Sequence, residues 1–275
     1  MRLKAIVQSI LHAHLIPRCP HQDIFGGRGR AWVLAQDVPP DERAAIIRHI
    51  EEYDRQTAAQ RVVEEDIARA AMPDTAVRRL MTIPGVDMVV AVGVMAAIGR
   101  IDRFPSADQL SAYLGLHASV RQSGDGPAYH GRITKRGRSD ARHLLVEAAW
   151  QTVRSPGPLR AFYERIKARR GAHVGAVAVA RKLAVLIWHM LSKGVDYAWG
   201  RPTLLARKMR KMELVAGEQA QRGQRGSAYG YNRPELRQAD RGMAKQAEQV
   251  YRRLMQHWQR TRRRAQPPAS PGTET

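Results

Sequence analysis

The sequence is poor in cysteine and in acidic side chains. Cys19 is the single cysteine among 275 residues, so no disulfide can form within the chain, and one thiol with scattered histidines gives no zinc-ligand spacing. Aspartate and glutamate number 25 against 46 lysines and arginines, which leaves a formal net charge of +21 at pH 7. Such a charge predicts a polyanionic partner, either nucleic acid or an anionic membrane surface, and it fits the footprint of a nucleic-acid-binding protein.

The chain also lacks a long apolar run free of charge. The apolar stretch at residues 174–191 contains Arg181, Lys182 and His189, which argues against a membrane-spanning helix. The amino-terminal stretch begins with basic and apolar residues, but His12 and His14 interrupt it and no small-residue cleavage site follows. It is therefore not typical of a signal peptide. We expect a cytoplasmic, nucleoid-associated protein that contacts no membrane.

Hydrophobic spacing predicts a mainly α-helical fold. Residues 1–40 contain an amphipathic helix near the amino terminus and a connecting segment. Residues 41–79 contain a helix of roughly 30 residues that ends before Pro73. A helix of this length often pairs with another helix. A coiled coil that dimerises the chain through residues 41–72 is one interpretation, and a plain surface helix is the other.

Residues 80–200 are expected to form the main helical domain, which opens with a helical hairpin. Pro84 and Gly85 are a turn signal between two apolar segments, Asp87 can cap the second helix, and Gly99 can end it. The pattern predicts a helix-hairpin-helix, whose turn and helix N-terminus offer N–H groups to a phosphate. Such modules usually carry a second glycine where this chain has Asp87. The alternative is a hairpin that only packs.

Glycine, serine and basic residues dominate residues 116–137 and predict a loop or a small β-hairpin. Ser123 lies in this segment. A serine hydroxyl is a weak nucleophile that needs activation, and basic groups stabilise the charge that develops when a phosphodiester is attacked. Ser123 is therefore a candidate catalytic residue, with a turn residue in a phosphate-binding loop as the alternative. The candidate nucleic-acid-binding residues are Pro84, Gly85, Arg121, Gly124, Arg132, Thr134, Lys135, Arg136 and Arg138.

Other side chains near this loop have weaker claims to a role. His117 and His130 are possible proton acceptors, although a histidine in a loop is more often a bystander. Tyr129 could stack on a base or act as a rival nucleophile. Asp125 would repel DNA unless it turns away or holds a cation. The acidic residues are scattered over different elements, so no metal site is predicted.

The composition changes after residue 200. Residues 201–275 carry 17 Lys+Arg against 6 Asp+Glu, so their net charge is 17 − 6 = +11. Apolar residues from Met243 to Trp258 recur at helical spacing, which predicts one amphipathic helix in a basic tail with a disordered end. A basic run on an already basic chain favours contact with phosphates over plain solvation.

Four motifs in a fixed order resemble those of a known transposase family. They are IPGVDMVVAVGVMAAIGRIDRF, DQLSAYLGL, QSG followed by GRITKRG, and VAVARKLAVLIWHMLSKG. Over about residues 1–200 the chain resembles the C-terminal part of transposases of insertion-sequence family 110/116/902. The resemblance implies that Ser123 attacks DNA phosphorus and that residues 131–137 match the pattern Gly-Arg-x-Ser/Thr-Lys-x-Gly of the family. It also implies a dimerising coiled coil over residues 41–72 and guidance by a structured bridge RNA.

The resemblance does not include the first domain of full family members. Full members begin with an RNase H-like domain that carries four acidic metal ligands, Asp-Glu-Asp-Asp, and this chain has no positions that match them. We therefore expect no cofactor in this chain, and Mg²⁺ only together with the missing domain. The expected function is DNA transposition, with Ser123 in a composite site and the chain alone inactive. The alternatives are a non-catalytic remnant that binds DNA or guide RNA, and a basic nucleoid or ribosome-like protein.

Overall fold

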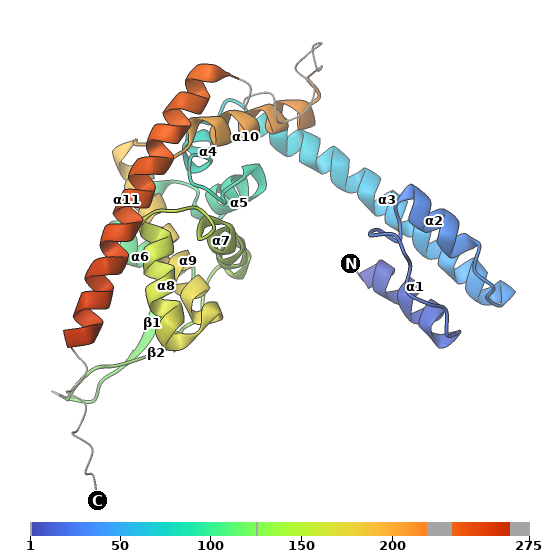
Figure 1. Cartoon of the computed structure of the whole chain (residues 1–275), viewed down its shortest axis with the longest axis horizontal. Coiled ribbons are helices and arrows are strands. Elements are labelled where there is room, and N and C mark those ends of the chain that lie inside the picture. Colours follow the sequence, from blue (N-terminus) through green and yellow to red (C-terminus); the bar gives the residue numbers. More distant parts are fainter. Residues whose placement is uncertain (1, 125, 219–232, 265–275) are drawn as a thin grey trace, which may run out of the picture. The chain divides into compact units, whose positions relative to one another are not determined.

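The computed structural model describes residues 2–124, 126–218 and 233–264. The fold is mainly α-helical, as the sequence predicted, with a single two-stranded sheet in the described residues (Figure 1). The chain forms two compact units, Met1–Asp66 and Ile67–Thr275. The candidate functional residues all lie in the second unit.

The first unit has its own small core. It contains α1 (Arg2–Ala13), α2 (Gly27–Leu34) and most of α3 (Pro40–Ala71). Its buried apolar side chains are Val7, Leu11, Ile24, Phe25, Val33, Val38, Ile46 and Ile50. The 32-residue α3 matches the predicted long helix. Its Val62 and Val63 are 59% and 56% exposed, and pairing of α3 with a second helix stays a prediction.

The second unit begins with a series of short helices. α4 (Thr75–Leu80), α5 (Met88–Ile98), the 3₁₀ helix η1 (Ile101–Arg103) and α6 (Ala107–Tyr113) follow one another. The Asp87 carboxylate accepts from the Val90 N–H at 3.0 Å, and the Ser106 hydroxyl accepts from the Gln109 N–H at 3.3 Å. Gly99 ends α5 with φ +61°, a conformation that glycine adopts without a Cβ clash. The caps at Asp87 and Gly99 agree with the sequence prediction.

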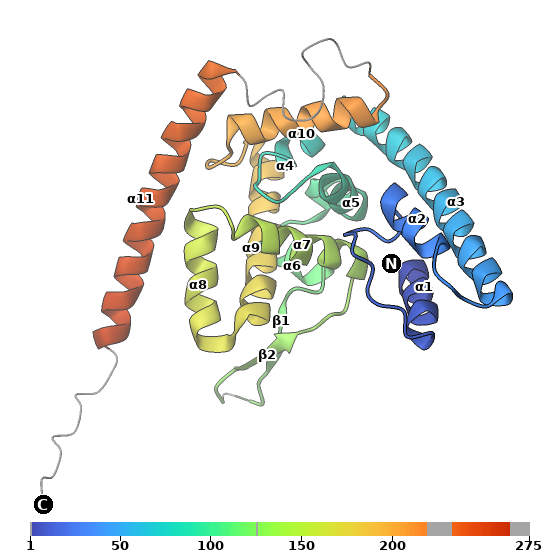
Figure 2. The ribbon, with the colours of Figure 1, turned by 45° about the vertical axis from the view of Figure 1, so that its right-hand side comes forward.

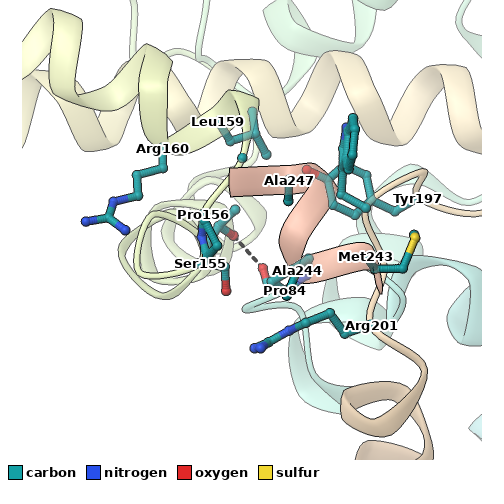
Figure 3. A pocket seen from close by; sticks show the side chains of 13 residues that line it. Pro84, Ser155, Pro156, Leu159, Arg160, Tyr197, Arg201, Met243, Ala244 and Ala247 are labelled. Atoms are coloured by element: carbon teal, nitrogen blue, oxygen red, sulfur yellow. Dashed lines mark hydrogen bonds between the residues drawn. The ribbon is translucent and has the colours of Figure 1, made fainter. Parts of the chain in front are cut away.

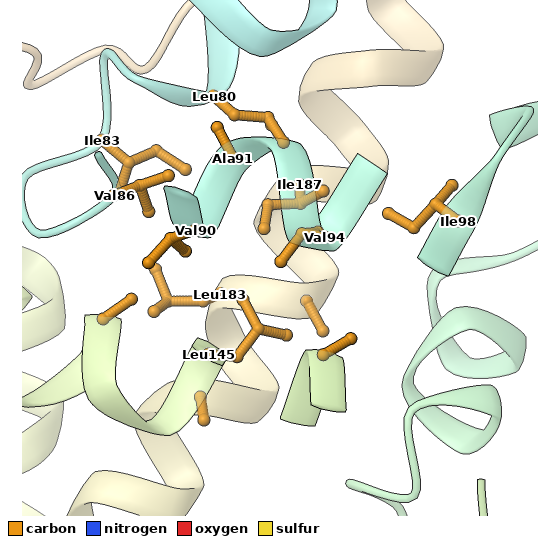
Figure 4. Packing of buried hydrophobic residues seen from close by; sticks show 14 of the residues in the cluster. Leu80, Ile83, Val86, Val90, Ala91, Val94, Ile98, Leu145, Leu183 and Ile187 are labelled. Carbon is orange, nitrogen blue, oxygen red and sulfur yellow. The ribbon is translucent and has the colours of Figure 1, made fainter. Parts of the chain in front are cut away.

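A long apolar helix forms the centre of this unit. The chain continues through β1 (Ala118–Arg121), β2 (Tyr129–Ile133), α7 (Ser139–Thr152), α8 (Pro158–Arg170) and α9 (Ala172–Lys193). α9 packs against α6, α7 and α8. Figure 4 shows Leu183 and Ile187 of α9 among side chains of α5 and α7. By length and composition alone α9 could cross a membrane, but its inner face is part of this core.

Two helices, not one, occupy the described part of residues 201–275. α11 (Pro234–Arg264) is the predicted amphipathic helix, and α10 (Pro202–Val215) was not predicted. Met212 of α10 is 1% exposed and belongs to the main core, so this region is more than a tail. The predicted disordered end lies outside the described residues. Figures 1 and 2 show α11 alongside α8, and the β1–β2 hairpin extends away from the helices of this unit.

Candidate nucleic-acid interface

The Gly/Arg-rich segment forms an antiparallel β-hairpin, the second of the two forms that the sequence allowed. Arg121 pairs with Tyr129 and Val120 with His130, and a bulge interrupts the ladder between Ala118 and Val120. A Cβ on Gly131 would lie 2.4 Å from the Ser119 hydroxyl oxygen. Glycine at this position therefore lets the bulged strand stay close to its partner.

Ser123 lies in the turn between the two strands, where its side chain is exposed. The Gly126 N–H donates to the Ser123 carbonyl at 3.3 Å, and Gly124 has φ +58°. A positive φ at this place is typical of the primed turns that close hairpins. In the described part of the chain no hydrogen bond reaches the Ser123 hydroxyl. Asp125 lies outside the described residues, as does the side chain of His130. His117 is at the opposite end of β1, where its Nδ1 lies 3.4 Å from Arg181 Nη2.

The base of the hairpin is tied to the C-terminal end of α6. The Lys135 N–H donates to the Gly115 carbonyl at 3.2 Å, and the Arg138 N–H donates to the Tyr113 carbonyl at 3.1 Å. Gly137 has φ +125°, and a Cβ there would lie 2.1 Å from the Tyr113 carbonyl oxygen. The last glycine of the GRITKRG motif is thus required by backbone contact. These backbone hydrogen bonds fix the position at which the basic residues of the hairpin extend from the helical domain.

Lys135 adopts an uncommon backbone conformation within this base. Its φ is +56°, in the left-handed region that costs a residue with a side chain free energy. The Arg142 guanidinium of α7 holds the bend, because its Nη1 donates to the Lys135 carbonyl at 3.1 Å and to the Leu114 carbonyl at 3.3 Å. Arg142 is a positioning residue that sequence reasoning missed.

Replacing Arg142 with methionine is expected to lower the free energy of unfolding by about 1–2 kcal/mol, because two backbone carbonyls lose a charged donor. Urea denaturation of the full chain would measure the change. Arg154 is exposed just beyond α7, so Arg154→Met is the matched control and should change stability by less than about 0.5 kcal/mol. Equal effects of the two variants would contradict a holding role for Arg142.

The predicted cationic side chains at the hairpin differ in whether they form ion pairs. Arg121, Arg132, Lys135 and Arg136 are exposed, and none of the four forms an ion pair with another described residue. Arg138 instead donates to both carboxylate oxygens of Asp140, at 3.2 and 2.7 Å. This pairing lowers the pKa of Asp140 to about 2 and raises the pKa of Arg138. Asp140 therefore partly neutralises the positive charge of Arg138. The charges of the other four side chains are not neutralised by any described residue.

The turn at Pro84 and Gly85 packs against the helical core. Pro84 is buried, and its carbonyl accepts from the Thr152 hydroxyl of α7 at 2.6 Å. Gly85 has φ +88°, and a Cβ there would lie 2.6 Å from the Ala148 carbonyl oxygen. From α10, Lys208 Nζ donates to three carbonyls of the same turn at 2.7–2.8 Å. This geometry gives the turn a packing role, and phosphate contact by Pro84 and Gly85 stays a prediction.

A hollow beside the Pro84 turn is too small for a substrate. It lies between the Pro84 turn, the start of α8, residues 197–201 and α11 (Figure 3). Its volume is about 20 Å³, which is room for one water molecule. The candidate functional site considered for nucleic acid is the open surface of the hairpin, where the exposed cations lie.

A metal site would need several acidic, histidine or cysteine side chains close together. Within the described residues no group of three or more histidine, cysteine, aspartate or glutamate side chains lies close enough together to hold a metal ion. The described side chains therefore do not by themselves form a site for the Mg²⁺ that the sequence resemblance implies.

Comparisons with known proteins match the same region. Residues 77–164 match the family model described as Transposase IS116/IS110/IS902 family. The "Transposase for insertion sequence element IS1111A" of Coxiella burnetii is 32% identical over 141 residues, which is 50% of this chain and 38% of that protein. The "Probable family 20 transposase" of Pseudomonas aeruginosa is 29% identical over 188 residues, or 63% of this chain and 55% of that protein.

A third relative also has a name that describes a transposase. The "Putative transposase y4qE" of Sinorhizobium fredii is 33% identical over 199 residues, which covers 61% of this chain and 49% of that protein. The chain spans about half the length of the curated relatives that it matches. The matched region of the family model contains the Pro84 turn, the whole hairpin and α7.

Proposed function

We propose, from the premise that residues 77–164 form a domain of the IS116/IS110/IS902 transposase family, that this chain acts on DNA in the transposition of an insertion sequence. Ser123 is the proposed nucleophile, and the hairpin cations are the proposed phosphate ligands. One observation carries the proposal: an exposed serine in the turn of a hairpin that bears four exposed cations without ion-pair partners in the described residues.

The proposed chemistry is a phosphoryl transfer to Ser123. The Ser123 Oγ–phosphorus bond forms while the bond from phosphorus to one sugar oxygen breaks. The proton of the serine hydroxyl leaves, and the departing sugar oxygen takes up a proton and becomes a free hydroxyl. The charge of the phosphodiester is kept, so no oxidant or second reactant is needed. Arg121, two residues before Ser123, would stabilise the negative charge that builds up on the phosphate oxygens. Arg132, Lys135 and Arg136 lie nearer the base of the hairpin and would hold neighbouring phosphates of the DNA.

The site is proposed to be composite. A serine needs a proton acceptor, and none of the described residues forms a hydrogen bond with the Ser123 hydroxyl. We therefore propose that the acceptor and the acidic metal ligands come from another polypeptide or segment, such as the RNase H-like domain that the family resemblance implies. A guide RNA, self-association through residues 41–72 and a location at the nucleoid are further proposals. The exposed Val62 and Val63 of α3 support self-association.

The test of the chemistry is transfer of DNA to protein. The chain would be incubated with a labelled element end, Mg²⁺ and a separately produced RNase H-like domain. A covalent protein–DNA species that resists denaturation is expected. If none forms while binding is intact, the second candidate function holds, in which the chain binds DNA or RNA without chemistry. The net charge of +21 favours binding in either case.

The binding surface can be tested separately through its salt dependence. We expect log affinity for duplex DNA to fall linearly with log salt concentration, with a slope of about −0.9 for each phosphate contacted. Changing Arg132, Lys135 and Arg136 together to glutamine should flatten that slope by up to about 3. Fluorescence anisotropy at several salt concentrations would measure it.

The matched control removes the same charge elsewhere. Arg169 and Arg170 at the end of α8 and Lys193 at the end of α9 are exposed, so their joint replacement by glutamine lowers the net charge equally. The control should leave the slope nearly unchanged. If both triple variants flatten the slope alike, binding follows overall charge and the hairpin is not the contact.

A further inference from the structure

Tyr129 is exposed in a way that the proposed transfer does not explain. It lies at the start of β2, and 71% of its surface is accessible. Within the part of the chain that the structure describes, its ring meets no other aromatic ring or cation, and its hydroxyl forms no hydrogen bond. A large aromatic side chain presented in this way, next to a functional turn, is typical of a binding surface.

The strand register places a cation beside this ring. Arg121 is the cross-strand partner of Tyr129, so the two side chains lie on the same face of the ribbon, near the Ser123 turn. Val120 is on the other face, because successive residues of β1 alternate. One face of the outer hairpin thus combines an exposed ring with an exposed guanidinium. This pair matches a nucleotide, whose base can stack on a ring and whose phosphate attracts a cation.

The outer half of the hairpin has no core of its own. β1 changes from half-buried at Ala118 and Ser119 to exposed at Val120 and Arg121, and Val120 is 48% exposed. A two-stranded ribbon alone is marginally stable in water. Contact with a partner would therefore add most to its stability at Tyr129 and Arg121. The exposed guanidinium of Arg121 beside the ring favours a nucleic acid over an apolar protein surface.

We infer that the Tyr129 face of the hairpin recognises unpaired bases in DNA, with Tyr129 stacking on one base and Arg121 contacting the adjoining phosphate. The inference rests on the proposed function and deepens it, because it names the state of the DNA that the hairpin engages. Stacking on an unpaired base next to the Ser123 turn would hold the strand to be cut away from its complement.

The test compares two labelled duplexes of one sequence, one fully paired and one with three central mismatches. The full chain should bind the mismatched duplex more tightly. Tyr129→Ala should lower that affinity roughly 5- to 150-fold, the range for loss of stacking on one base, and leave the paired duplex nearly unchanged. Tyr129→Phe keeps the ring and should behave as the unsubstituted chain, whereas Tyr129→Leu should behave as Tyr129→Ala.

Two controls separate this idea from the others. Val120→Ala trims an exposed side chain on the opposite face and should change neither affinity. Ser123→Ala should leave the preference for mismatches intact. If the unsubstituted chain forms no covalent product but keeps this preference, the result counts against the transfer chemistry and not against base recognition. Equal binding of both duplexes, or equal losses with Tyr129→Ala and Val120→Ala, would overturn the inference and indicate binding to the paired groove.

Discussion

Replacing Ser123 with alanine is expected to reduce covalent attachment of the chain to DNA by at least about 1000-fold, since removal of a nucleophile leaves only the contribution of binding. DNA affinity should stay within about twofold, because the side chain is exposed and no described residue bonds to its hydroxyl. The measurement is the amount of labelled protein–DNA species that survives denaturation, in the presence of the partner domain and Mg²⁺.

The hairpin supplies a matched control for this result. Ser119 lies four residues earlier, on β1, and faces Gly131. Ser119→Ala removes an identical hydroxyl outside the turn and should preserve the covalent species. Ser123→Cys keeps a nucleophilic atom in the same place and should retain part of the activity. Mass spectrometry of the digested adduct would identify the attached residue directly.

A surviving adduct in Ser123→Ala would point to another nucleophile. The alternative nucleophile that the sequence offers is Tyr129, which begins the strand that follows the turn. Loss of the species in Tyr129→Phe, together with its survival in Ser123→Ala, would move the chemistry to the tyrosine. Because Tyr129→Phe keeps the aromatic ring, this outcome would be independent of base stacking.

Features of the fold that depend on neighbours in sequence could be predicted. The caps at Asp87 and Ser106 follow from a short polar side chain and an N–H three residues later. The long helix α3 and the central helix α9 follow from periodic apolar residues over many turns. The hairpin was expected as one of two forms, because glycine and basic residues specify a turn without specifying strand pairing.

Features that depend on distant contacts could not be predicted. Arg142 holds a carbonyl 28 residues earlier, and nothing in its local sequence distinguishes it from the other arginines. α10 was missed because Lys and Arg alternate with its apolar residues and resemble a basic tail. The packing role of the Pro84 turn depends on α7 and α10, which follow it far along the chain. Local sequence therefore gave the turn but not its burial.

Removing the ammonium group of Lys208 is expected to lower the free energy of unfolding of this unit strongly. Its ammonium group reaches the carbonyls of Met81, Ile83 and Val86 at 2.7–2.8 Å, and so joins α10 to the Pro84 turn. Lys208→Met fills a similar volume without a donor and leaves those carbonyls without their charged partner. A buried acceptor left unpaired costs about 1–3 kcal/mol, so we expect the free energy of unfolding to fall by about 2–4 kcal/mol.

The matched control for Lys208 is on the same helix. Lys211 is exposed on α10, and Lys211→Met should change the free energy of unfolding by less than about 0.5 kcal/mol. Thermal or urea unfolding of the full chain would compare the two. A small effect of Lys208→Met would show that water or a shifted backbone satisfies the carbonyls, and that the turn does not depend on α10.

The pH dependence of the free energy of unfolding tests the Lys208 contact in a second, independent way. Burial lowers the pKa of Lys208 from 10.5 to about 8, Asp87 opposes the shift, and Arg207 and Arg201 add to it. Between about pH 8 and 10.5 the unfolded chain therefore binds more protons at this residue than the folded chain does. Stability contributed by Lys208 must then rise with pH across that window. The burial penalty on the charge is full below pH 8 and fades above it.

This sign can be checked by subtracting one titration from another. The free energy of unfolding of the unsubstituted chain, minus that of Lys208→Met, should increase from pH 7 to pH 9.5. Groups common to both proteins cancel, including Tyr197, whose pKa burial raises to about 12. A difference that stays flat would mean that the three carbonyls hold the ammonium charged throughout, because acceptors of that kind favour the protonated form. The anchor would then be a permanent cation, and the Pro84 turn would be fixed by charge at every pH at which DNA binding is measured.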